Sequence, residues 1–353
     1  MSEERAARGM AVGKFWPPHH GHHAMINHLV EQCERTLVLV CATPEQVPSG
    51  LDRALWLQQV HPGAEVVVCD DFCDWHFPHG CREECSREWA DRVHELGLGP
   101  IDVVVSSESY GERFAGLLGA RHVDFDPERS AHPVSGTAVR ASLADSWGSL
   151  HPVTRAGMFR RVVMLGAEST GTTTLVNDLS SALGLPCTPE LGRTVSWELY
   201  ARAGDMTAVT WTERHFWTIV NAQVRTELLA LHAAEAAAPG PLGPWLVCDT
   251  DTLATVAWWE RYLKSPSAPL LEFASARLAD LYVITSPDGV EFDDSDPTRD
   301  GRHVRRSMHE RLVELVRASG RPWLTVEGGR SARVAQVEAA LLGHESRYPR
   351  FAR

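Results

Sequence analysis

The stretch FRRVVMLGAESTGTTTLVNDLSSAL, residues 159–183, has the order of a strand, a glycine-containing loop and a helix. Residues 159–166 form an apolar, β-rich run, and residues 173–183 repeat apolar side chains at helical spacing. The loop between them, GAESTGTTT (166–174), keeps the spacing GxxxxGK[ST] of a phosphate-binding loop except that Thr172 replaces the lysine. This order predicts an α/β domain with a phosphate site between its first strand and first helix.

Further β-rich runs follow this stretch at spacings that fit a parallel sheet. They are WLVCD (245–249), LYVIT (281–285) and WLTVE (323–327). Long segments separate them, as crossover connections between parallel strands require. AAEAAAPGPLGP (233–244) has the composition of a connection between elements. We therefore expect an α/β domain over residues 158–345.

The half of the chain before this stretch alternates in the same way. Its β-rich runs cover residues 10–15, 36–42, 65–70, 101–107 and 122–126. Helical patterns fit residues 22–34, 51–60, 82–96 and 109–118, and a further helix is expected to start at Ser135. WGSLHPVTRAGM (147–158) contains Gly and Pro and has no clear period, so we place a boundary there. The fold class predicted is α/β, with another parallel-sheet domain over residues 1–150.

Composition limits the classes of partner. The 353 residues carry a net charge of -12, so no general basic field attracts nucleic acid or an anionic membrane. The N-terminal residues mix both charge signs without an apolar core, and no run of about 18 apolar residues occurs. We expect a cytoplasmic protein with small-molecule ligands, no nucleic-acid partner and no membrane partner; assembly into a homo-oligomer is left open.

One cluster of metal-ligating residue types stands in a long loop. Cys73, Cys81 and Cys85 flank His76 and His79, but the spacing matches no CxxC pairing. Ordinary solvated or buried side chains are favoured over a zinc site here. The other cysteines lie in apolar or strand-like surroundings, where reduced thiols are common: Cys33, Cys41, Cys69, Cys187 and Cys248.

The first strand candidate is followed by GKFWPPHHGHH (13–23), which leads into a helix near Gly21. A glycine turn there lets phosphate oxygens approach backbone N–H groups at a helix N-terminus, where the helix dipole favours anions. His19 and His22 are three residues apart, so both imidazoles can face one phosphate. Taken by itself, the stretch favours a metal site, surface histidines or satisfied core histidines over a phosphate site.

The stretch VSGTAVR (134–140) resolves that ambiguity. Ser135 is a good N-cap, and Thr137 and Arg140 follow in the opening turns. These positions bring a hydroxyl, backbone donors and a guanidinium toward a triphosphate. Taken alone, this stretch is a plain helix start; together with GKFWPPHHGHH it defines a two-part signature.

The pattern GxFxPxHxGH with [IV]SGTxxR resembles the HxGH nucleotidyltransferase superfamily. That resemblance implies transfer of a nucleotidyl group from a triphosphate to a phosphate or similar acceptor, with release of pyrophosphate. It implies that His19 and His22 stabilise the transferring phosphate, that Lys14 assists, and that Thr137 and Arg140 hold the triphosphate. The remaining residues implied to contact nucleotide are Gly13, Phe15, Gly21, Ser107, Asp126, Arg129 and Ser135.

Other segments narrow the resemblance. DRALWLQQV (52–60) places Arg53 and Trp56 on one helical face, which suits a substrate's phosphate and aromatic base; core packing is the alternative for Trp56. SSESYGERFAGLLG (106–119) follows the fourth strand at the edge where open α/β sheets bind ligands. With VDFDPERSAHPVSGTAVR (123–140) next, the order resembles the NadR-like family. That family couples a Rossmann-like nicotinamide mononucleotide adenylyltransferase domain to a P-loop ribosylnicotinamide kinase domain.

For the second domain the resemblance implies that ATP is a substrate and Mg²⁺ a cofactor. Thr173 and Asp249 would hold the metal, with Asp249 also catalytic, while Asp251, Glu190 and Arg193 would contact the acceptor. Residues implied to contact nucleotide are Gly166, Glu168, Ser169, Thr170, Gly171, Thr172, Thr173, Thr174 and, from a lid at 293–306, Arg299 and Arg302. A lysine lost from such a site removes a charge-assisted contact worth roughly 1.5–3 kcal/mol. Arginines of the lid could replace part of that charge.

The resemblance implies a nicotinamide mononucleotide adenylyltransferase with weak nicotinamide riboside kinase activity. The alternatives are an adenylyltransferase for another phosphate acceptor and, for the second domain, a nucleotide-sensing module without turnover. Besides Thr172, the sequence departs from the family's kinase pattern at two places, which bear on kinase turnover. The lid reads DDSDPTRDG where DDGxR is common in the family, and Thr194 stands where an acidic residue is common. Only nine residues precede Met10, so we expect none of the DNA-binding domain that some members carry.

Overall fold

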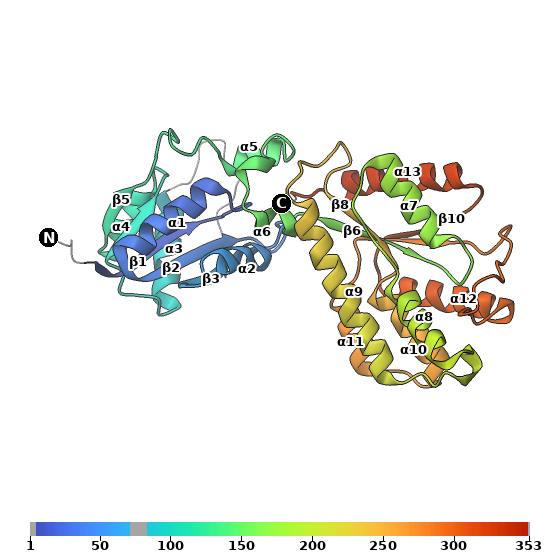
Figure 1. Ribbon diagram of the computed structural model, residues 1–353. Coiled ribbons are helices and arrows are strands. Elements are labelled where there is room, and N and C mark those ends of the chain that lie inside the picture. Colours follow the sequence, from blue (N-terminus) through green and yellow to red (C-terminus); the bar gives the residue numbers. More distant parts are fainter. Residues whose placement is uncertain (1–4, 71–82, 352–353) are drawn as a thin grey trace. The chain divides into compact units, whose positions relative to one another are not determined.

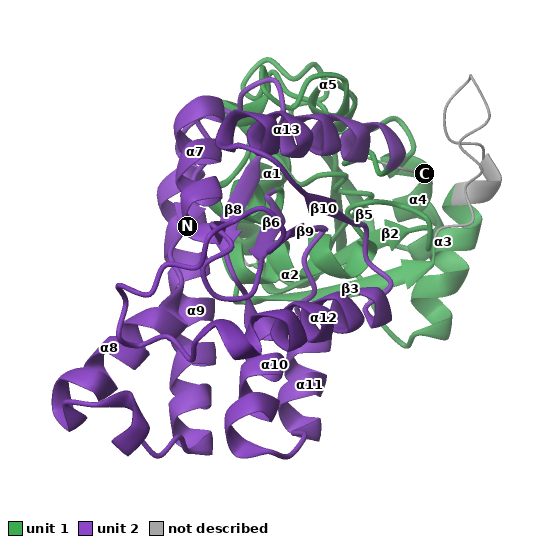
Figure 2. Ribbon diagram, turned by 90° about the vertical axis from the view of Figure 1, so that its right-hand side faces the viewer, with its two compact units in different colours: residues 1–158, 348–353 green, residues 159–347 purple. Residues whose placement is uncertain are grey.

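The computed structural model describes residues 5–70 and 83–351, with the side chains of residues 83–85 left out of the description. The chain divides into two compact units, coloured separately in Figure 2. Unit 1 comprises Met1–Met158 and Tyr348–Arg353, and unit 2 comprises Phe159–Arg347. The last segment joins unit 1 through Arg350, whose Nη1 donates to the Met158 carbonyl at 2.7 Å. Each unit is a parallel-sheet α/β fold.

Unit 1 is built on a five-stranded parallel sheet with the order β3-β2-β1-β4-β5. The strands are β1 (Ala6–Gly13), β2 (Cys33–Ala42), β3 (Ala64–Asp70), β4 (Val103–Ser106) and β5 (Arg121–Asp124). After β3 the chain crosses back over β1 to form β4, so the direction of winding changes between β1 and β4. Loops that leave the carboxyl ends of these two strands diverge there, which opens a crevice for ligands.

Helices cover both faces of this sheet because its strands are buried on both sides. Met10 and Val12 of β1 pack in one apolar cluster with α3 and α4, while Ala11 packs in the other with α1 and α2. The helices of unit 1 are α1 (His20–Gln32), α2 (Gly50–Val60), α3 (Glu83–Glu95), α4 (Gly111–Leu118), α5 (Gly136–Ala141) and α6 (Pro152–Gly157). Residues 147–149, expected as part of an irregular boundary, form the 3-10 helix η1 (Trp147–Ser149), and α6 follows it.

Unit 2 has a second five-stranded parallel sheet, with the order β10-β9-β6-β8-β7. Its strands are β6 (Arg160–Leu165), β7 (Cys187–Thr188), β8 (Trp245–Asp249), β9 (Leu281–Thr285) and β10 (Trp323–Val326). The central strand β6 leads directly into the phosphate-loop sequence. Sequence reasoning missed β7, which has only two residues and no apolar run long enough to predict a strand.

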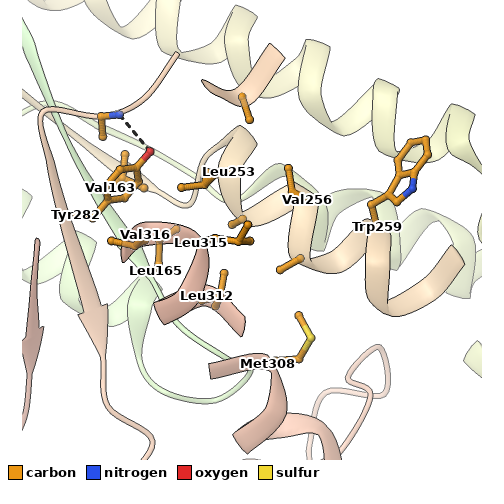
Figure 3. Close-up of a cluster of buried hydrophobic side chains, with 14 of the residues drawn as sticks. Val163, Leu165, Leu253, Val256, Trp259, Tyr282, Met308, Leu312, Leu315 and Val316 are labelled. Atoms are coloured by element: carbon orange, nitrogen blue, oxygen red, sulfur yellow. Dashed lines mark hydrogen bonds between the residues drawn. The ribbon is translucent and has the colours of Figure 1, made fainter. Parts of the chain in front are cut away.

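Alternate residues of β6 point to opposite faces of the second sheet. Val163 and Leu165 pack with α10 and α12, as Figure 3 shows, whereas Val162 and Met164 pack with α7 and α13. Figure 1 shows α7 and α13 on one side of this sheet and α9, α10 and α12 on the other. The helices are α7 (Thr172–Leu183), α8 (Leu191–Ala203), α9 (Glu213–Ala234), α10 (Thr252–Leu263), α11 (Ala268–Ser275), α12 (Arg302–Ala318) and α13 (Arg330–Arg347), with a 3-10 turn η2 (Met206–Ala208). None of the helices in the described ranges combines the length and apolar character needed to cross a bilayer.

Candidate functional sites

Unit 1 contains a cavity of about 850 Å³ at the point where the winding of its sheet reverses. Its walls come from the loops that follow β1, β4 and β5, together with the side chains of α3 that face them. Of the residues expected in this site, the cavity is lined by Gly13, Lys14, Phe15, His19, Gly21, His22, Ser107, Asp126, Arg129, Ser135, Thr137 and Arg140. The fold thus brings together two motifs that are more than 100 residues apart in the sequence.

The two histidines of the first motif form a stacked pair. Their ring centroids are 3.6 Å apart with an interplanar angle of 20°, and Phe15 contacts the His22 ring edge-on. His19 stands at the N-cap of α1 in an extended conformation, and its backbone N–H donates to Nδ1 of His22 at 3.3 Å. Because Nδ1 of His22 accepts this bond, we assign the ring hydrogen to Nε2, which leaves an N–H available as a donor.

Both imidazoles are neutral at neutral pH. Burial lowers the pKa of His19 to about 3, and the positive charges of Arg129, His20 and Arg140 add to the effect. Burial also holds the pKa of His22 well below its ordinary value of 6.5, with His19 as the next contributor. A neutral pair can donate hydrogen bonds to phosphate oxygens without having to lose a proton first.

The second motif is joined to the first by Arg140. Its Nη1 donates to the Trp16 carbonyl at 2.6 Å, its guanidinium lies 4.5 Å from the centroid of the Trp16 ring, and its Nη2 contacts Thr137 at 3.1 Å. Ser135 caps α5 by accepting the Ala138 N–H at 3.1 Å. These contacts fix a guanidinium at the wall of the cavity, beside the histidine-bearing loop.

The loop after β5 forms a third side. The carboxylate of Asp126 accepts the backbone N–H groups of Ser130, Ala131 and His132, which holds the loop in a tight turn. Arg129 has a positive φ of 53° and forms an ion pair with Glu108 at 2.8 Å. Asp126 therefore orders the loop that carries Arg129. The hydroxyl of Ser107, on the loop after β4, donates to the carbonyl of Phe125.

Two residues expected to bind substrate are core residues instead. Arg53 is fully buried, and its guanidinium donates to the carbonyls of Ser49 and Lys14 and to Gln46. Trp56 is 8% exposed and packs against Gly157, where an added Cβ would lie 2.3 Å from the indole. Neither lines the cavity, so the structure places the two residues expected on this helical face in the core beside it. The backbone carbonyls around Arg53 require a donor, and the guanidinium provides it.

Several cavity residues were not predicted. Tyr110 donates to the Val12 carbonyl at 3.2 Å, and Trp89 of α3 packs edge-on against Tyr110 with ring centroids 5.2 Å apart. Their sequence neighbourhoods, YGERF and REWAD, carry no phosphate-binding pattern. The cavity is also lined by Trp16, Ser86, Glu108, Glu112, Arg113 and His132.

The phosphate-loop sequence of unit 2 has the backbone that such a loop needs. Gly166 is required by packing, since a Cβ there would lie 2.2 Å from Oγ1 of Thr285 and 2.3 Å from Oγ1 of Thr170. Ser169 and Gly171 have positive φ values of 61° and 86°. Thr170 Oγ1 bonds the Ala167 carbonyl at 2.8 Å and Thr285 at 2.6 Å. Helix α7 begins at Thr172, so backbone N–H groups of the loop and of the first turn are available to an anion.

Asp249, at the end of β8, lies beside this first turn. Burial raises the pKa of Asp249, while the hydroxyls of Thr173 and Thr172 and the charge of Arg193 act in the opposite direction. Oδ2 of Asp249 and Oγ1 of Thr173 are buried, and the Thr173 hydroxyl lies close enough to the carboxylate to act on its pKa. A buried carboxylate beside a hydroxyl oxygen offers the oxygen ligands that a hard divalent cation such as Mg²⁺ prefers. Thr174 lies on the exposed side of the same turn.

A second cavity, of about 90 Å³, adjoins the loop. Its aromatic wall comes from Trp211, Trp258 and Tyr262; the Trp211 and Tyr262 rings stack 4.8 Å apart. Its polar lining includes Glu168, Glu190, Gly192, Arg193, Ser196, Thr250, Thr255, Asp296, Thr298 and Arg299. Sequence reasoning missed the aromatic residues, because Trp258 and Tyr262 are four apart on a helix and such a pair is equally typical of a core.

Two carboxylates of this cavity have distinct surroundings. Burial and the neighbouring charge of Asp249 raise the pKa of Glu190 to about 7, and Arg193, at 3.5 Å, opposes the rise. Glu168 of the loop accepts the backbone N–H groups of Asp300 and Gly301 at 2.9–3.3 Å. Glu168 thereby connects the phosphate loop to the segment that precedes α12.

Asp251 does not line the cavity. Its carboxylate accepts the N–H groups of Leu253 and Ala254 as the N-cap of α10, and Oδ2 also accepts the hydroxyl of Tyr282 at 2.9 Å. All of these contacts are buried, so in this structure Asp251 caps α10, and its expected contact with substrate stays a prediction. The two lid arginines are paired with acids: Arg299 with Asp293 at 3.0 Å and Arg302 with Asp294 at 2.8 Å.

Within the described ranges, no three His, Cys, Asp or Glu side chains are placed to hold a metal ion. The cluster of Cys73, Cys81 and Cys85 lies outside the residues and side chains described. None of the other cysteines, which are Cys33, Cys41, Cys69, Cys187 and Cys248, is part of a disulfide, and Sγ of Cys69 lies 3.5 Å from Sγ of Cys41.

A family model described as an AAA domain matches residues 161–333. Two relatives share the name Trifunctional NAD biosynthesis/regulator protein NadR. The protein from Salmonella typhimurium is 26% identical over 204 residues, which cover 52% of this chain and 48% of the relative. The protein from Escherichia coli is 26% identical over 200 residues, with the same coverage. The chain spans about half the length of the curated relatives it matches.

Two solved structures share the fold over nearly the whole chain. A crystal structure of NadR protein in complex with NAD and AMP-PNP has a TM-score of 0.59 and 17% identity, covering 97% of this chain and 96% of that one. A crystal structure of NadR protein in complex with NR has a TM-score of 0.62 and 17% identity, covering 96% and 97%.

Proposed function

We propose that this chain, a homologue of NadR, is an enzyme of NAD synthesis whose unit 1 transfers the adenylyl group of ATP to nicotinamide mononucleotide. The products are NAD and pyrophosphate. The observation that carries the proposal is the neutral His19–His22 pair, stacked at 3.6 Å on the wall of a cavity of about 850 Å³ that Lys14 and Arg140 also line.

The reaction needs no covalent intermediate on the protein. A phosphate oxygen of the acceptor attacks the α-phosphorus of ATP, the bond from that phosphorus to the β-phosphate oxygen breaks, and pyrophosphate leaves. The protein has to align the two substrates and stabilise the negative charge that develops on the α-phosphate. In the proposed roles, the imidazole N–H groups donate to the α-phosphate, while Lys14 and Arg140 offset the charge of the triphosphate.

The acceptor is tested by incubating the full chain with ATP, Mg²⁺ and either nicotinamide mononucleotide or nicotinate mononucleotide. We expect NAD from the nicotinamide acceptor as the faster reaction. No NAD at all, with pyrophosphate released on another phosphate acceptor, would assign unit 1 to the alternative adenylyltransferase activity.

For unit 2 we propose binding of ATP with Mg²⁺ and slow phosphorylation of nicotinamide riboside. The loop 166–174 would hold the phosphates through its backbone, and Thr173 with Asp249 would hold the metal. Support for the metal comes from the buried carboxylate of Asp249 and the Thr173 hydroxyl beside it. Mg²⁺ held by these two residues would offset the negative charge of the phosphates.

The acceptor proposed for unit 2 follows from the second cavity. The aromatic lining and the carboxylates of Glu190 and Asp296 suit a flat ring with a positive charge, through stacking, cation–π attraction and ion pairing. The pyridinium ring of nicotinamide riboside has that chemistry. Nicotinate riboside adds a carboxylate that these acids would repel.

Calorimetric binding of both ribosides, beside a phosphorylation assay with ATP, tests this proposal. We expect tighter binding of nicotinamide riboside than of nicotinate riboside, with slow turnover. Binding of ATP without any phosphorylation would favour the alternative, a nucleotide-sensing module; Thr172 is the observation that keeps this alternative open.

A further inference from the structure

Two arginines hold the outer side of the phosphate loop in unit 2. Arg333 of α13 donates from Nη1 to the Thr170 carbonyl at 2.7 Å and from Nε to the Gly328 carbonyl at 2.9 Å. Arg305 of α12 donates from Nη2 to the Ser169 carbonyl at 2.8 Å. Consecutive carbonyls of the loop are therefore fixed by guanidinium groups from two different helices.

This arrangement matters because a loop that binds phosphate with its N–H groups must turn its carbonyls the other way. Each outward carbonyl then needs a donor, and here the donors are cations. The guanidinium of Arg333 also lies close behind the second glycine of the loop. A Cβ added to Gly171 would stand 3.6 Å from Nη1 of Arg333.

Neither arginine is in salt-bridge contact with an acid among the described residues, although the charge of Asp288 acts on Arg305. Arg333 is 6% exposed. The other lid arginines differ, since Arg299, Arg302 and Arg306 pair with aspartates. A buried cation without a counter-ion is unfavourable. An anion bound to the N–H groups of the loop would therefore balance part of the charge of the arginines on its carbonyl side.

We propose that Arg333, assisted by Arg305, supplies from behind the loop the positive charge that Thr172 does not supply in front of it. The ligand is the polyphosphate of a nucleotide. Both arginines are positioning residues, because they act through the peptide groups of Ser169 and Thr170. The proposal rests on ATP binding by unit 2 and adds the residues that make it work without a lysine.

The test uses hydrogen exchange of the full chain, titrated with MgATP and read on peptides covering residues 166–174. Because the readout is local, ATP bound by unit 1 does not enter it. In the unsubstituted protein we expect the loop amides to become protected as MgATP is added. Arg333→Met should raise the MgATP concentration at half-protection about tenfold or more. As a control for folding, peptides from β8 should exchange at the same rate in Arg333→Met as in the unsubstituted protein, which would show that unit 2 of the variant is folded.

Arg330→Met is the matched control, one turn earlier on α13. Arg330 is 73% exposed and pairs with Asp178, so the half-protection concentration should change less than twofold. A double variant distinguishes an electrostatic role of Arg333 from a purely structural one. Adding Thr172→Lys to Arg333→Met should recover most of the lost affinity for MgATP. A merely structural arginine would not be rescued in this way.

The outcomes separate the two proposals. Equal half-protection concentrations for Arg333→Met and Arg330→Met, or no recovery with Thr172→Lys, would overturn the role of Arg333 while leaving ATP binding by unit 2 intact. No protection of residues 166–174 in the unsubstituted protein would instead reject ATP binding by unit 2, and the arginine role with it.

Discussion

His19 and His22 stack with ring centroids 3.6 Å apart, and the backbone N–H of His19 bonds Nδ1 of His22. A single turn of α1 therefore fixes both rings and the tautomer of one of them. Two residues at the spacing HxxH can therefore present both imidazoles to one phosphate, as proposed above.

His19→Ala is expected to lower the rate of NAD formation about 10²–10³-fold, the usual effect of removing one donor to developing charge. The KM for ATP should change much less, since Lys14 and Arg140 remain. Steady-state assays give both constants, and His94→Ala, on an exposed part of α3, is the control. A rate within fivefold of the unsubstituted enzyme would exclude a catalytic role for His19.

Trp56→Ala should destabilise unit 1 by about 3–5 kcal/mol, because it removes a large side chain from the core beside Gly157. KM values of the folded variant should stay within twofold of those of the unsubstituted protein, because Trp56 does not line the cavity. Denaturant unfolding measures the first effect, and Trp197→Ala, where the side chain is 43% exposed, is the control. A tenfold rise in the KM for the acceptor would restore Trp56 as a substrate contact.

Unit 1 should lose stability on acidification below about pH 6.5. His23 and His61 are buried and joined at 2.9 Å, and burial, together with the charges of His61 and His151, lowers the pKa of His23 to about 3. Between pH 6.5 and 3 the unfolded chain binds a proton at His23 that the folded chain does not. In this window the free energy of unfolding therefore increases as the pH rises. Each such group lowers it by roughly 1.4 kcal/mol for every pH unit of acidification.

Hydrogen exchange of β2 peptides at pH 7.5 and 5.0 measures this loss in unit 1, after correction for intrinsic exchange rates. His23→Leu should reduce the difference between the two pH values, whatever its effect on stability at pH 7.5, and His94→Leu should not. An identical difference in His23→Leu and the unsubstituted chain would show that His23 does not contribute.

Binding of nicotinamide riboside should strengthen between pH 6 and 8. The pKa of Glu190 is about 7, so its carboxylate becomes ionised in this range and attracts a cationic ring. Calorimetry should show an increase of several-fold in affinity, which Glu190→Gln removes. An unchanged pH profile in Glu190→Gln would exclude this carboxylate as the cause.

Thr172→Lys should raise the rate of riboside phosphorylation by about an order of magnitude, since the ammonium would reach the β- and γ-phosphates directly. The comparison is with Thr172→Met, which has a long side chain without charge. Equal rates for the two variants would count against the argument that a missing charge limits turnover.

Nearly all of the strands and their order along the chain could be read from the sequence, because parallel strands leave apolar runs separated by helical segments; the two-residue β7 leaves no such run. Motif residues at strand ends were also predictable: His19, Lys14 and Arg140 line one cavity as expected. Contacts between segments far apart in the sequence could not be read in this way. The sequence indicates an exposed Arg53, whereas in the structure its buried guanidinium donates to the carbonyls of Ser49 and Lys14 and to Gln46.

The acceptor side of unit 2 shows the same limit. Asp249 and Asp251 are two residues apart at one strand end, yet one faces the loop and the other caps α10. Sequence spacing alone does not say which aspartate turns inward. Arg333, which lies on the last helix and holds the loop from behind, follows no motif at all.

The most direct measurement traces phosphorus through the reaction of unit 1. The full chain is supplied with nicotinamide mononucleotide, Mg²⁺ and ATP labelled at the α-phosphorus or, separately, at the γ-phosphorus. We predict the α-label in NAD and the γ-label in pyrophosphate, with both products formed about 10²–10³-fold more slowly by His19→Ala. Label from the γ-phosphorus in inorganic phosphate or in the acceptor, with no α-label in NAD, would contradict this prediction.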